Sequence, residues 1–139
     1  MSDVSFKMDT RELDKIVRNM DHNKNKVGKL LGFELEAEAK KRAPRLTSAM
    51  ANSIYTVTKE QDGYTNASGA AKQANPKVET NRIPKPTENV IANVGPCVNY
   101  AEYVEFGTSK QAAQPFLTPA AETMVDKLNS GEYWRKLVE

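Results

Sequence analysis

The side chains most often used in catalysis are scarce in this chain of 139 residues. Histidine is the usual proton shuttle near neutral pH, and the only histidine is His22, in a polar stretch between two apolar segments. The only cysteine, Cys97, follows a Gly-Pro turn and has no candidate base near it in the sequence. A nucleophilic thiol or hydroxyl needs such a base for activation. The sequence therefore predicts a surface histidine and a buried or incidental thiol, not a catalytic pair.

Metal and phosphate sites are not indicated either. One histidine and one cysteine cannot supply the nitrogen and sulfur ligands of a zinc site. Glu34, Glu36 and Glu38 alternate, so on a helix they spread around the cylinder and do not converge on a metal. Glu102 and Glu105 could pair as acids, but a solvated helix surface is the better interpretation. The GTSK segment lacks the glycine spacing of a phosphate-binding loop. We predict no cofactor, no metal site and no enzyme activity.

Composition bounds the protein class further. The net charge is +2, so no strong basic field points to nucleic acid or to an acidic membrane surface. A single cysteine excludes an internal disulfide. No apolar run approaches the length of a membrane span, and the start of the chain, MSDVSFKMD, lacks the layout of a signal peptide. We therefore expect a protein that is kept in a reducing cytoplasm.

The first quarter of the chain has clear periodicities. Residues 4–9 alternate strictly between apolar and polar side chains, which predicts a half-buried strand. A capping-box pattern between Asp9 and Glu12 predicts that a helix begins at Thr10. The polar residues 21–26 are either a joint between two helices or a solvated turn within one long helix. The helix carries one apolar stripe at i, i+3, i+4 and i+7, formed by Leu13, Ile16, Val17 and Met20.

A second helical run extends from Val27 to a stop at Pro44 and is rich in alanine, leucine, glutamate and lysine. Gly28 and Gly32 lie four residues apart within it. They either permit close approach by a neighbouring backbone or weaken the helix without further consequence.

The middle of the chain predicts the sheet and a long connection. Residues 45–54 form a short turn or helix, and the β-branched residues at 54–60 predict a strand. A DG turn follows, and the YTN sequence after it could be a short returning strand. Residues 66–89 contain three prolines and few large apolar groups, which predicts a flexible loop. Residues 90–94 predict another strand, ended by the Gly-Pro dipeptide.

The C-terminal third is predicted to be helical. Asn99 and Glu102 resemble a capping box, and Gly107 is placed as a left-handed helix stop. Thr118, with a proline after it, is placed as the N-cap of the next helix. Residues 130–139 offer a short helical extension. The next helix has the cleanest apolar period in the chain, at Leu117, Ala120, Ala121, Met124, Val125 and Leu128.

The order of these elements lacks the regular alternation of a parallel βαβ sheet. It predicts one α+β domain over residues 1–139, in which a small antiparallel sheet is packed by two N-terminal and two C-terminal helices. The chain contains no internal repeat.

One aromatic segment, NYAEYVEFGTSKQAAQPFLTPAAE at 99–122, raises a packing question. A short helix cannot bury Tyr100, Tyr103 and Val104 together with Phe106, because Phe106 points away from their stripe. Either the sheet covers one side and the C-terminal helix the other, or part of this surface meets another copy or a partner, where tyrosine and phenylalanine are enriched.

The same segment resembles the signature of a family of tailed-phage neck proteins, the tail-completion or head–tail joining proteins. The signature is a tyrosine, then VEFGT, a short polar stretch, and QPFLxPA. The matching residues are Tyr100, Tyr103, Val104, Glu105, Phe106, Gly107, Thr108, Gln114, Pro115, Phe116, Leu117, Pro119 and Ala120. A second, supporting block follows the long helix, at Ala43, Pro44, Thr47, Ser48, Ala49, Met50, Asn52, Ser53 and Ile54. Ser48 stands where the family usually has glycine, which puts the tight turn there in question.

The resemblance implies a structural protein of the virion, assembled in the host cytoplasm late in infection. It implies a homo-oligomeric ring of about six or twelve copies that joins the head connector to the tail. The implied partners are the connector or stopper protein and the tail terminator or tube protein. DNA would pass through the channel without sequence-specific binding, and no membrane is involved. A tail terminator subunit, similar in size and also ring-forming, is the alternative within this class.

The resemblance and the aromatic content together give two sets of candidate residues. The expected oligomer or partner interface comprises Tyr100, Tyr103, Glu105, Phe106, Gly107, Thr108, Gln114, Pro115 and Phe116. The loop segment expected to become ordered on assembly comprises Asn75, Pro76, Lys77, Arg82, Ile83 and Pro84.

An alternative from a different class is a small nucleic-acid-binding module. It would use the lysine-rich segments KNKVGK at 24–29 and KKRAPR at 40–45. These segments have few interleaved aromatic residues, so they form a weak binding stripe.

Overall fold

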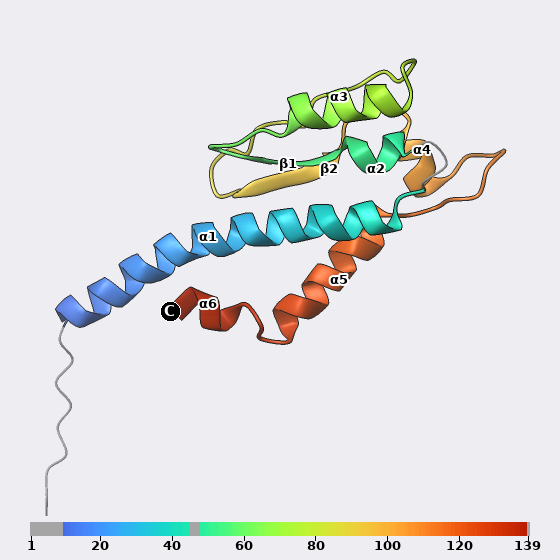
Figure 1. Ribbon diagram of the computed structural model, residues 1–139. Coiled ribbons are helices and arrows are strands. Elements are labelled where there is room, and N and C mark those ends of the chain that lie inside the picture. Colours follow the sequence, from blue (N-terminus) through green and yellow to red (C-terminus); the bar gives the residue numbers. More distant parts are fainter. Residues whose placement is uncertain (1–9, 45–47, 139) are drawn as a thin grey trace, which may run out of the picture.

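The computed structural model describes residues 10–44 and 48–138 (Figure 1). The strand predicted at 4–9 lies outside the described residues. Within them the chain forms six helices and one two-stranded antiparallel sheet, which confirms the predicted α+β class. The elements are α1 (Thr10–Arg42), α2 (Ala49–Ser53), β1 (Ile54–Thr58), α3 (Tyr64–Ala74), β2 (Ala92–Pro96), α4 (Ala101–Phe106), α5 (Leu117–Asn129) and α6 (Trp134–Val138).

The two helices predicted at the N-terminal end are one. α1 runs without interruption through the polar residues 21–26, so the solvated-turn interpretation is correct and the joint is wrong. The stretch contains neither proline nor glycine, and its exposed side chains need no apolar cover. His22 is an exposed residue on this helix. With 33 residues, α1 is about 50 Å long. Figure 1 shows its N-terminal end extending beyond the other elements.

The sheet pairs β1 with β2 from Ile54 opposite Pro96 to Thr58 opposite Ala92. Every residue of β1 is buried, since α1 covers one face of the sheet, α3 lies over the other, and α2 directly precedes β1 at the end of the sheet. The strand predicted at 90–94 is displaced by two residues. Gly95 and Pro96 belong to β2 and do not end it. A proline is tolerated here because it is the last residue of an edge strand.

The first part of the predicted loop at 66–89 is a helix, which corrects both the loop and the short strand predicted at YTN. α3 begins at Tyr64, whose backbone N–H donates to the Asp62 carboxylate at 2.9 Å. Its buried residues are Ala67 and Ala71, whose methyl groups allow close packing. The remaining residues, 75–89, contain no helix or strand.

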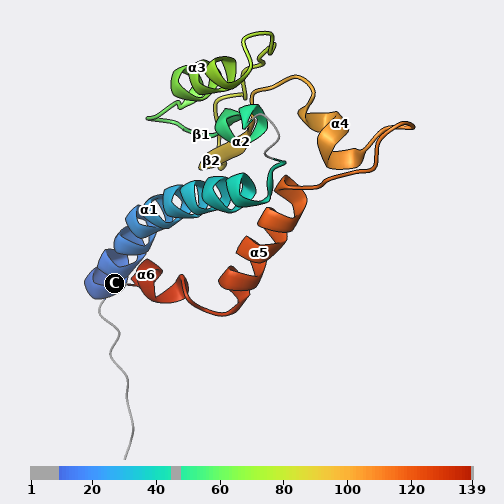
Figure 2. The same ribbon diagram turned by 45° about the vertical axis from the view of Figure 1, so that its right-hand side comes forward.

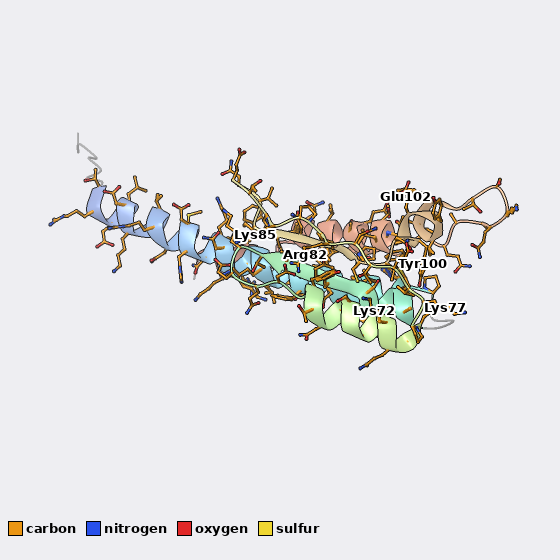
Figure 3. All side chains as sticks on the ribbon, turned by 90° about the horizontal axis from the view of Figure 1, so that it is seen from above. Lys72, Lys77, Arg82, Lys85, Tyr100 and Glu102 are labelled. Carbon is orange, nitrogen blue, oxygen red and sulfur yellow. The ribbon has the colours of Figure 1, made fainter. Side chains whose placement is uncertain are left out.

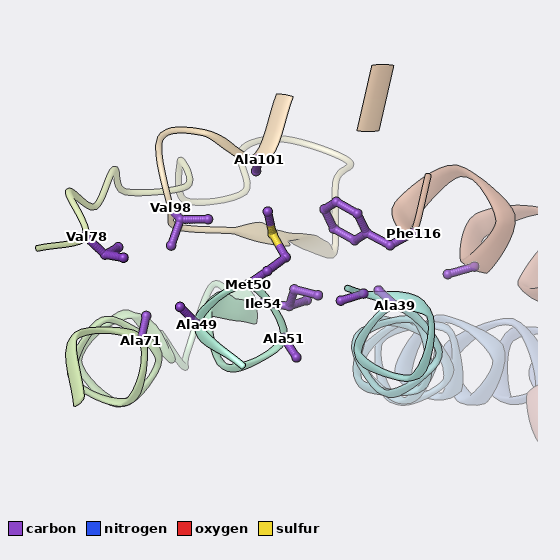
Figure 4. Close-up of a cluster of buried hydrophobic side chains, with 12 residues drawn as sticks. Ala39, Ala49, Met50, Ala51, Ile54, Ala71, Val78, Val98, Ala101 and Phe116 are labelled. Atoms are coloured by element: carbon purple, nitrogen blue, oxygen red, sulfur yellow. The ribbon is translucent and has the colours of Figure 1, made fainter. Parts of the chain in front are cut away.

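The hydrophobic core lies between the sheet, α2, α3 and the C-terminal end of α1 (Figure 4). Met50, Ile54 and Phe116 are its largest members, and buried alanines from α1, α2 and α3 pack around them. On the opposite side of α1, α5 and α6 build a second cluster around Met124 and Tyr133. The Tyr133 hydroxyl donates a hydrogen bond to Glu34 of α1. The layers are therefore α3, the sheet with α2 at its end, α1, and then α5 with α6 (Figures 1 and 2).

Gly28 and Gly32 let β2 approach α1 closely. A Cβ atom at Gly28 would lie 2.6 Å from Ile91 Cδ1, and one at Gly32 would lie 3.1 Å from Ala92 Cβ. Such distances are too short for ordinary contact, so the close-approach alternative holds, and the neighbours are the side chains of Ile91, just before β2, and of Ala92 within it.

Ser48 has a glycine-like backbone conformation. Its φ is 60° and its ψ is −1°, and it immediately precedes α2 without making a side-chain capping bond. A left-handed conformation costs an L-residue about 1–2 kcal/mol relative to glycine. Ser48 therefore adopts the positive φ that glycine favours, while the preceding residues 45–47 lie outside the described residues.

Candidate interaction surface

A buried carboxylate joins the two halves of the aromatic segment. Glu105 of α4 is 8% exposed. Its Oε2 accepts hydrogen bonds from the backbone N–H groups of Phe116 and Leu117 at 2.9 and 3.0 Å, and its Oε1 accepts one from Thr118 at 2.8 Å. These N–H groups belong to the first turn of α5, where a helix has no internal acceptors and favours negative charge. Glu105 therefore caps α5 from another helix.

The electrostatics of Glu105 agree with this role. Burial raises the pKa of its carboxyl group, but hydrogen bonds from the Thr118 side chain and from the three backbone N–H groups outweigh burial, so the pKa lies below its ordinary value. The group is therefore held as a carboxylate inside the subunit. This corrects its placement on a solvated helix surface, and it leaves little of Glu105 for contact with a partner.

Both side-chain caps predicted for this region are wrong. α5 begins at Leu117, and Thr118 does not cap it because Glu105 supplies the acceptors. α4 begins at Ala101 without a side-chain cap. The Asn99 side chain instead donates to the Glu79 carboxylate at 2.8 Å, so it does not form a capping box with Glu102.

The link between α4 and α5, residues 107–116, is a narrow projecting loop (Figures 1 and 2). It starts at Gly107, whose backbone has φ 79° and ψ 172°, a conformation that essentially only glycine adopts. This conformation differs from the left-handed helix stop that was predicted for Gly107. A Cβ there would lie 2.7 Å from the backbone nitrogen of Ala113. Backbone hydrogen bonds between Thr108 and Gln111, and from Gln114 to the Val104 carbonyl at 2.8 Å, hold the two arms together.

The nine candidate interface residues fall into two groups, four that are wholly or partly buried or shape the backbone and five that are exposed. Glu105 and Phe116 are buried, Tyr100 packs half-buried on the core, and Gly107 shapes the backbone. Tyr103 and Phe106 are 59% and 75% exposed. We call the exposed members the aromatic edge, and they are Tyr103, Phe106, Thr108, Gln114 and Pro115. The other four residues form the hydrogen-bonded and packed base of this edge.

The candidate loop residues have partners within the subunit. Arg82 forms an ion pair with Asp62 at 2.6 Å and lies over the Tyr64 ring, 4.3 Å from its centroid. The Ile83 N–H donates to the Tyr55 hydroxyl at 2.6 Å.

Three more of these residues are held near the start and the end of the segment. The Lys77 N–H donates to the Asn75 side chain at 3.2 Å, and the Pro84 carbonyl accepts from the Asn93 side chain at 2.9 Å. Pro76 is exposed. Ordering of this segment on assembly stays a prediction.

The two reactive side chains considered in the sequence do not approach each other. Cys97 is fully buried, and burial raises the pKa of its thiol, which disfavours the nucleophilic thiolate. Among the described residues, no group of His, Cys, Asp and Glu is arranged to hold a metal ion. In the same residues, no helix is long and apolar enough to span a membrane.

The basic segments proposed for nucleic-acid binding are partly paired with neighbouring acids. Lys29 pairs with Glu60 at 2.9 Å, and Lys41 and Arg42 both pair with Glu38. Other exposed cations lie around α3 and the segment after it, where Figure 3 shows Lys72, Lys77, Arg82 and Lys85 on one side of the molecule. Arg82 of this group is paired with Asp62.

Comparison with known proteins gives one match. The family model HK97-gp10_like, described as "Bacteriophage HK97-gp10, putative tail-component", matches residues 10–107. No curated protein and no solved structure matches the chain. The matched range ends at Gly107, so the QPFL block lies outside it. The Glu105 hydrogen bonds connect that block physically to the matched part.

Proposed function

The chain belongs to the HK97-gp10-like family of phage tail components, and from this membership we propose that it is a ring-forming subunit of the virion neck. In this role it completes the tail and joins it to the head connector. As a tail component the protein is part of the virion.

The observation that supports this proposal is the aromatic edge on its fixed base. The hydrogen bonds of the Glu105 carboxylate connect α4 to the start of α5, and the side chains of Tyr103 and Phe106 on α4 remain exposed to solvent. Exposed aromatic residues on a rigid scaffold are typical of binding surfaces, where they lose little conformational entropy on association. We propose that the aromatic edge contacts the neighbouring neck or tail protein.

The proposed mechanism is geometric. The ring matches the symmetry of its neighbours and leaves an open channel for DNA, and the subunit catalyses no reaction. The neighbours are the connector or stopper on one side and the terminator or tube protein on the other. Alone, the subunit is monomeric or weakly associated, and the ring forms with these partners.

A deletion experiment tests the role. Phage that lack the gene should make filled heads and separate tails of normal length, counted by electron microscopy, and supplying the gene in trans should restore joined particles. Tails of uncontrolled length would instead assign the alternative role of tail terminator. Normal joining without the gene would refute both.

The aromatic edge is tested in the same complementation assay. Replacing Tyr103 or Phe106 by serine should reduce joined particles without changing the thermal stability of the subunit, since both side chains are exposed. Trp134 on α6 is 62% exposed and distant in the fold, so Trp134→Ser is the matched control. Equal loss in all three variants would contradict the proposed surface.

Nucleic-acid binding is tested by a gel-shift series in salt. The ion pairs on α1 predict weak DNA binding with a shallow dependence on salt concentration, whereas several phosphate contacts would give a steep one.

A further inference from the structure

The N-terminal half of α1 carries an apolar stripe without cover in the described part of the chain. Leu13, Ile16, Val17 and Met20 share one face and are 45%, 52%, 50% and 40% exposed. Residues 10–22 are exposed along their whole length, and Figure 1 shows the N-terminal end of α1 extending beyond the other elements. α6 contacts α1 just beyond this stretch, where the Asn23 side chain donates to the Leu137 carbonyl at 2.9 Å. An amphipathic helix in a soluble protein normally buries its apolar stripe, so this face is suited to a partner.

The same subunit has an open apolar groove elsewhere. The groove has a volume of about 460 Å³ and lies between α1, β2 and α5. Its floor is α1 from Gly28 to Leu35, and its walls include Ile91 and Val94 on one side and Val125 on the other. Val125 is 52% exposed although it belongs to the apolar period of α5. The groove is therefore an unfilled gap in the packing of the sheet and α5 around α1.

The stripe and the groove match in length and chemistry. The stripe extends over seven residue intervals, from residue 13 to residue 20, and the groove floor also extends over seven, from residue 28 to residue 35. Each of the two segments is therefore about 10 Å long along the helix axis. The stripe cannot fold back into the groove of its own subunit, since both lie on one continuous helix. A second copy of the chain carries the same stripe on an exposed helix end and can place it in this groove.

We propose that the stripe of one copy lies in the groove of the next copy, head to tail. A stripe and a groove at different places on the subunit make a heterologous contact, which closes into a ring or grows as a filament. The closure into a ring rests on the proposed function, whereas the contact itself does not.

The size of this contact fits weak association of the free protein. The four side chains of the stripe expose about 300 Å² of apolar surface, which is the larger part of what this contact can bury. Stable complexes bury roughly 1,200–2,000 Å² in total, so one such contact is too small to hold two copies tightly. In a closed ring each copy makes two of these contacts, one through its stripe and one through its groove.

The test places a cysteine in each surface. In Val17→Cys one thiol lies in the stripe, in Val125→Cys one lies in the groove wall, and the native Cys97 is buried and contributes little background. A short bismaleimide should link the double variant into a ladder of dimers, trimers and larger species. Mixing the two single variants should give dimers only, and each single variant alone should give none. Gly69→Cys on α3, where an added Cβ meets open space, is the control for random collisions.

Three results would overturn the proposal. Dimers of Val17→Cys alone would mean that two stripes pack against each other. Linking of Gly69→Cys at the same rate as the double variant would mean collision. No ladder at high protein concentration and none in assembled particles would mean that another occupant fills the groove.

A charge substitution provides an independent measurement. Val17→Asp should weaken self-association at least about tenfold in sedimentation experiments, since it brings a charge into an apolar groove. His22→Asp adds the same charge to the opposite face of the same helix and should have little effect. Equal effects would exclude the stripe as the contact.

The cross-linking is done both with the purified protein and in particles restored by the double variant. Joined particles without a ladder would reject the contact and leave the neck function standing. A ladder together with normal joining in the absence of the gene would support the contact and reject the neck function.

Discussion

Replacing Glu105 by glutamine should destabilise the subunit measurably. The carboxylate accepts three backbone hydrogen bonds at 2.8 to 3.0 Å, and a hydrogen bond to a charged group contributes about 1.5–3 kcal/mol. Glutamine keeps one acceptor oxygen, loses the charge, and turns an NH2 group toward at least one N–H. We expect Glu105→Gln to lower the free energy of unfolding by about 2 kcal/mol and Glu105→Ala by about 4 kcal/mol.

The pH dependence of this effect has a definite sign. The pKa of the Glu105 carboxyl group is lower in the folded protein than in the unfolded chain. Its contribution is therefore fully present above the unfolded pKa, near 4.3, and is lost as the pH falls through the folded pKa. The stability difference between the wild type and Glu105→Gln should be largest at neutral pH and should shrink in acid.

The assay is urea unfolding followed by circular dichroism at several pH values. Glu102→Gln is the control, because Glu102 is exposed on the same short helix, three residues before Glu105. If both variants lost the same stability, or if the Glu105→Gln difference did not depend on pH between 7 and 3, the capping role would be refuted.

Three further predictions concern the backbone and the thiol. Ser48→Gly should raise the free energy of unfolding by about 1 kcal/mol in the same urea assay, because glycine relieves the positive φ and no side-chain capping bond is lost. Gly107→Ala should lower it by about 2 kcal/mol or more, because a Cβ there meets the Ala113 backbone; an unchanged midpoint would contradict the described link. Cys97 should react with a thiol reagent only as fast as the protein unfolds, so its rate should rise with urea in step with the unfolded fraction.

The elements that the sequence predicted well are those with large side chains at a regular period. The apolar positions of α5 and the β-branched residues of β1 needed no tertiary information. α3 was missed because its buried residues, Ala67 and Ala71, are too small to give a strong apolar period. The interruption of the long helix was left open because polar residues 21–26 suit a turn and an exposed helix equally well.

The candidate surface was only partly predictable. Its aromatic residues are visible in the sequence, but the Glu105 hydrogen bonds are not, because its partners are backbone N–H groups 11 to 13 residues away. No sequence signal pointed to Glu105, because Thr118 followed by proline already looked like an N-cap, whereas α5 begins one residue earlier and needs an acceptor from elsewhere. The groove was invisible for a similar reason: it is formed by the spacing of α1, β2 and α5, which no single segment encodes.

The two proposed surfaces should be separable by mutation. The aromatic edge lies near the C-terminal end of α1, whereas the stripe lies at its opposite end (Figure 1). Because distant sites act independently, Phe106→Ser should leave the Val17–Val125 cross-linking pattern intact while reducing joined particles. Val17→Asp should abolish the cross-linked ladder of a Met20→Cys, Val125→Cys variant and, through loss of the ring, also reduce joining. If Phe106→Ser abolished the ladder too, the aromatic edge would belong to the contact between copies, and its assignment to a neighbouring neck or tail protein would be wrong.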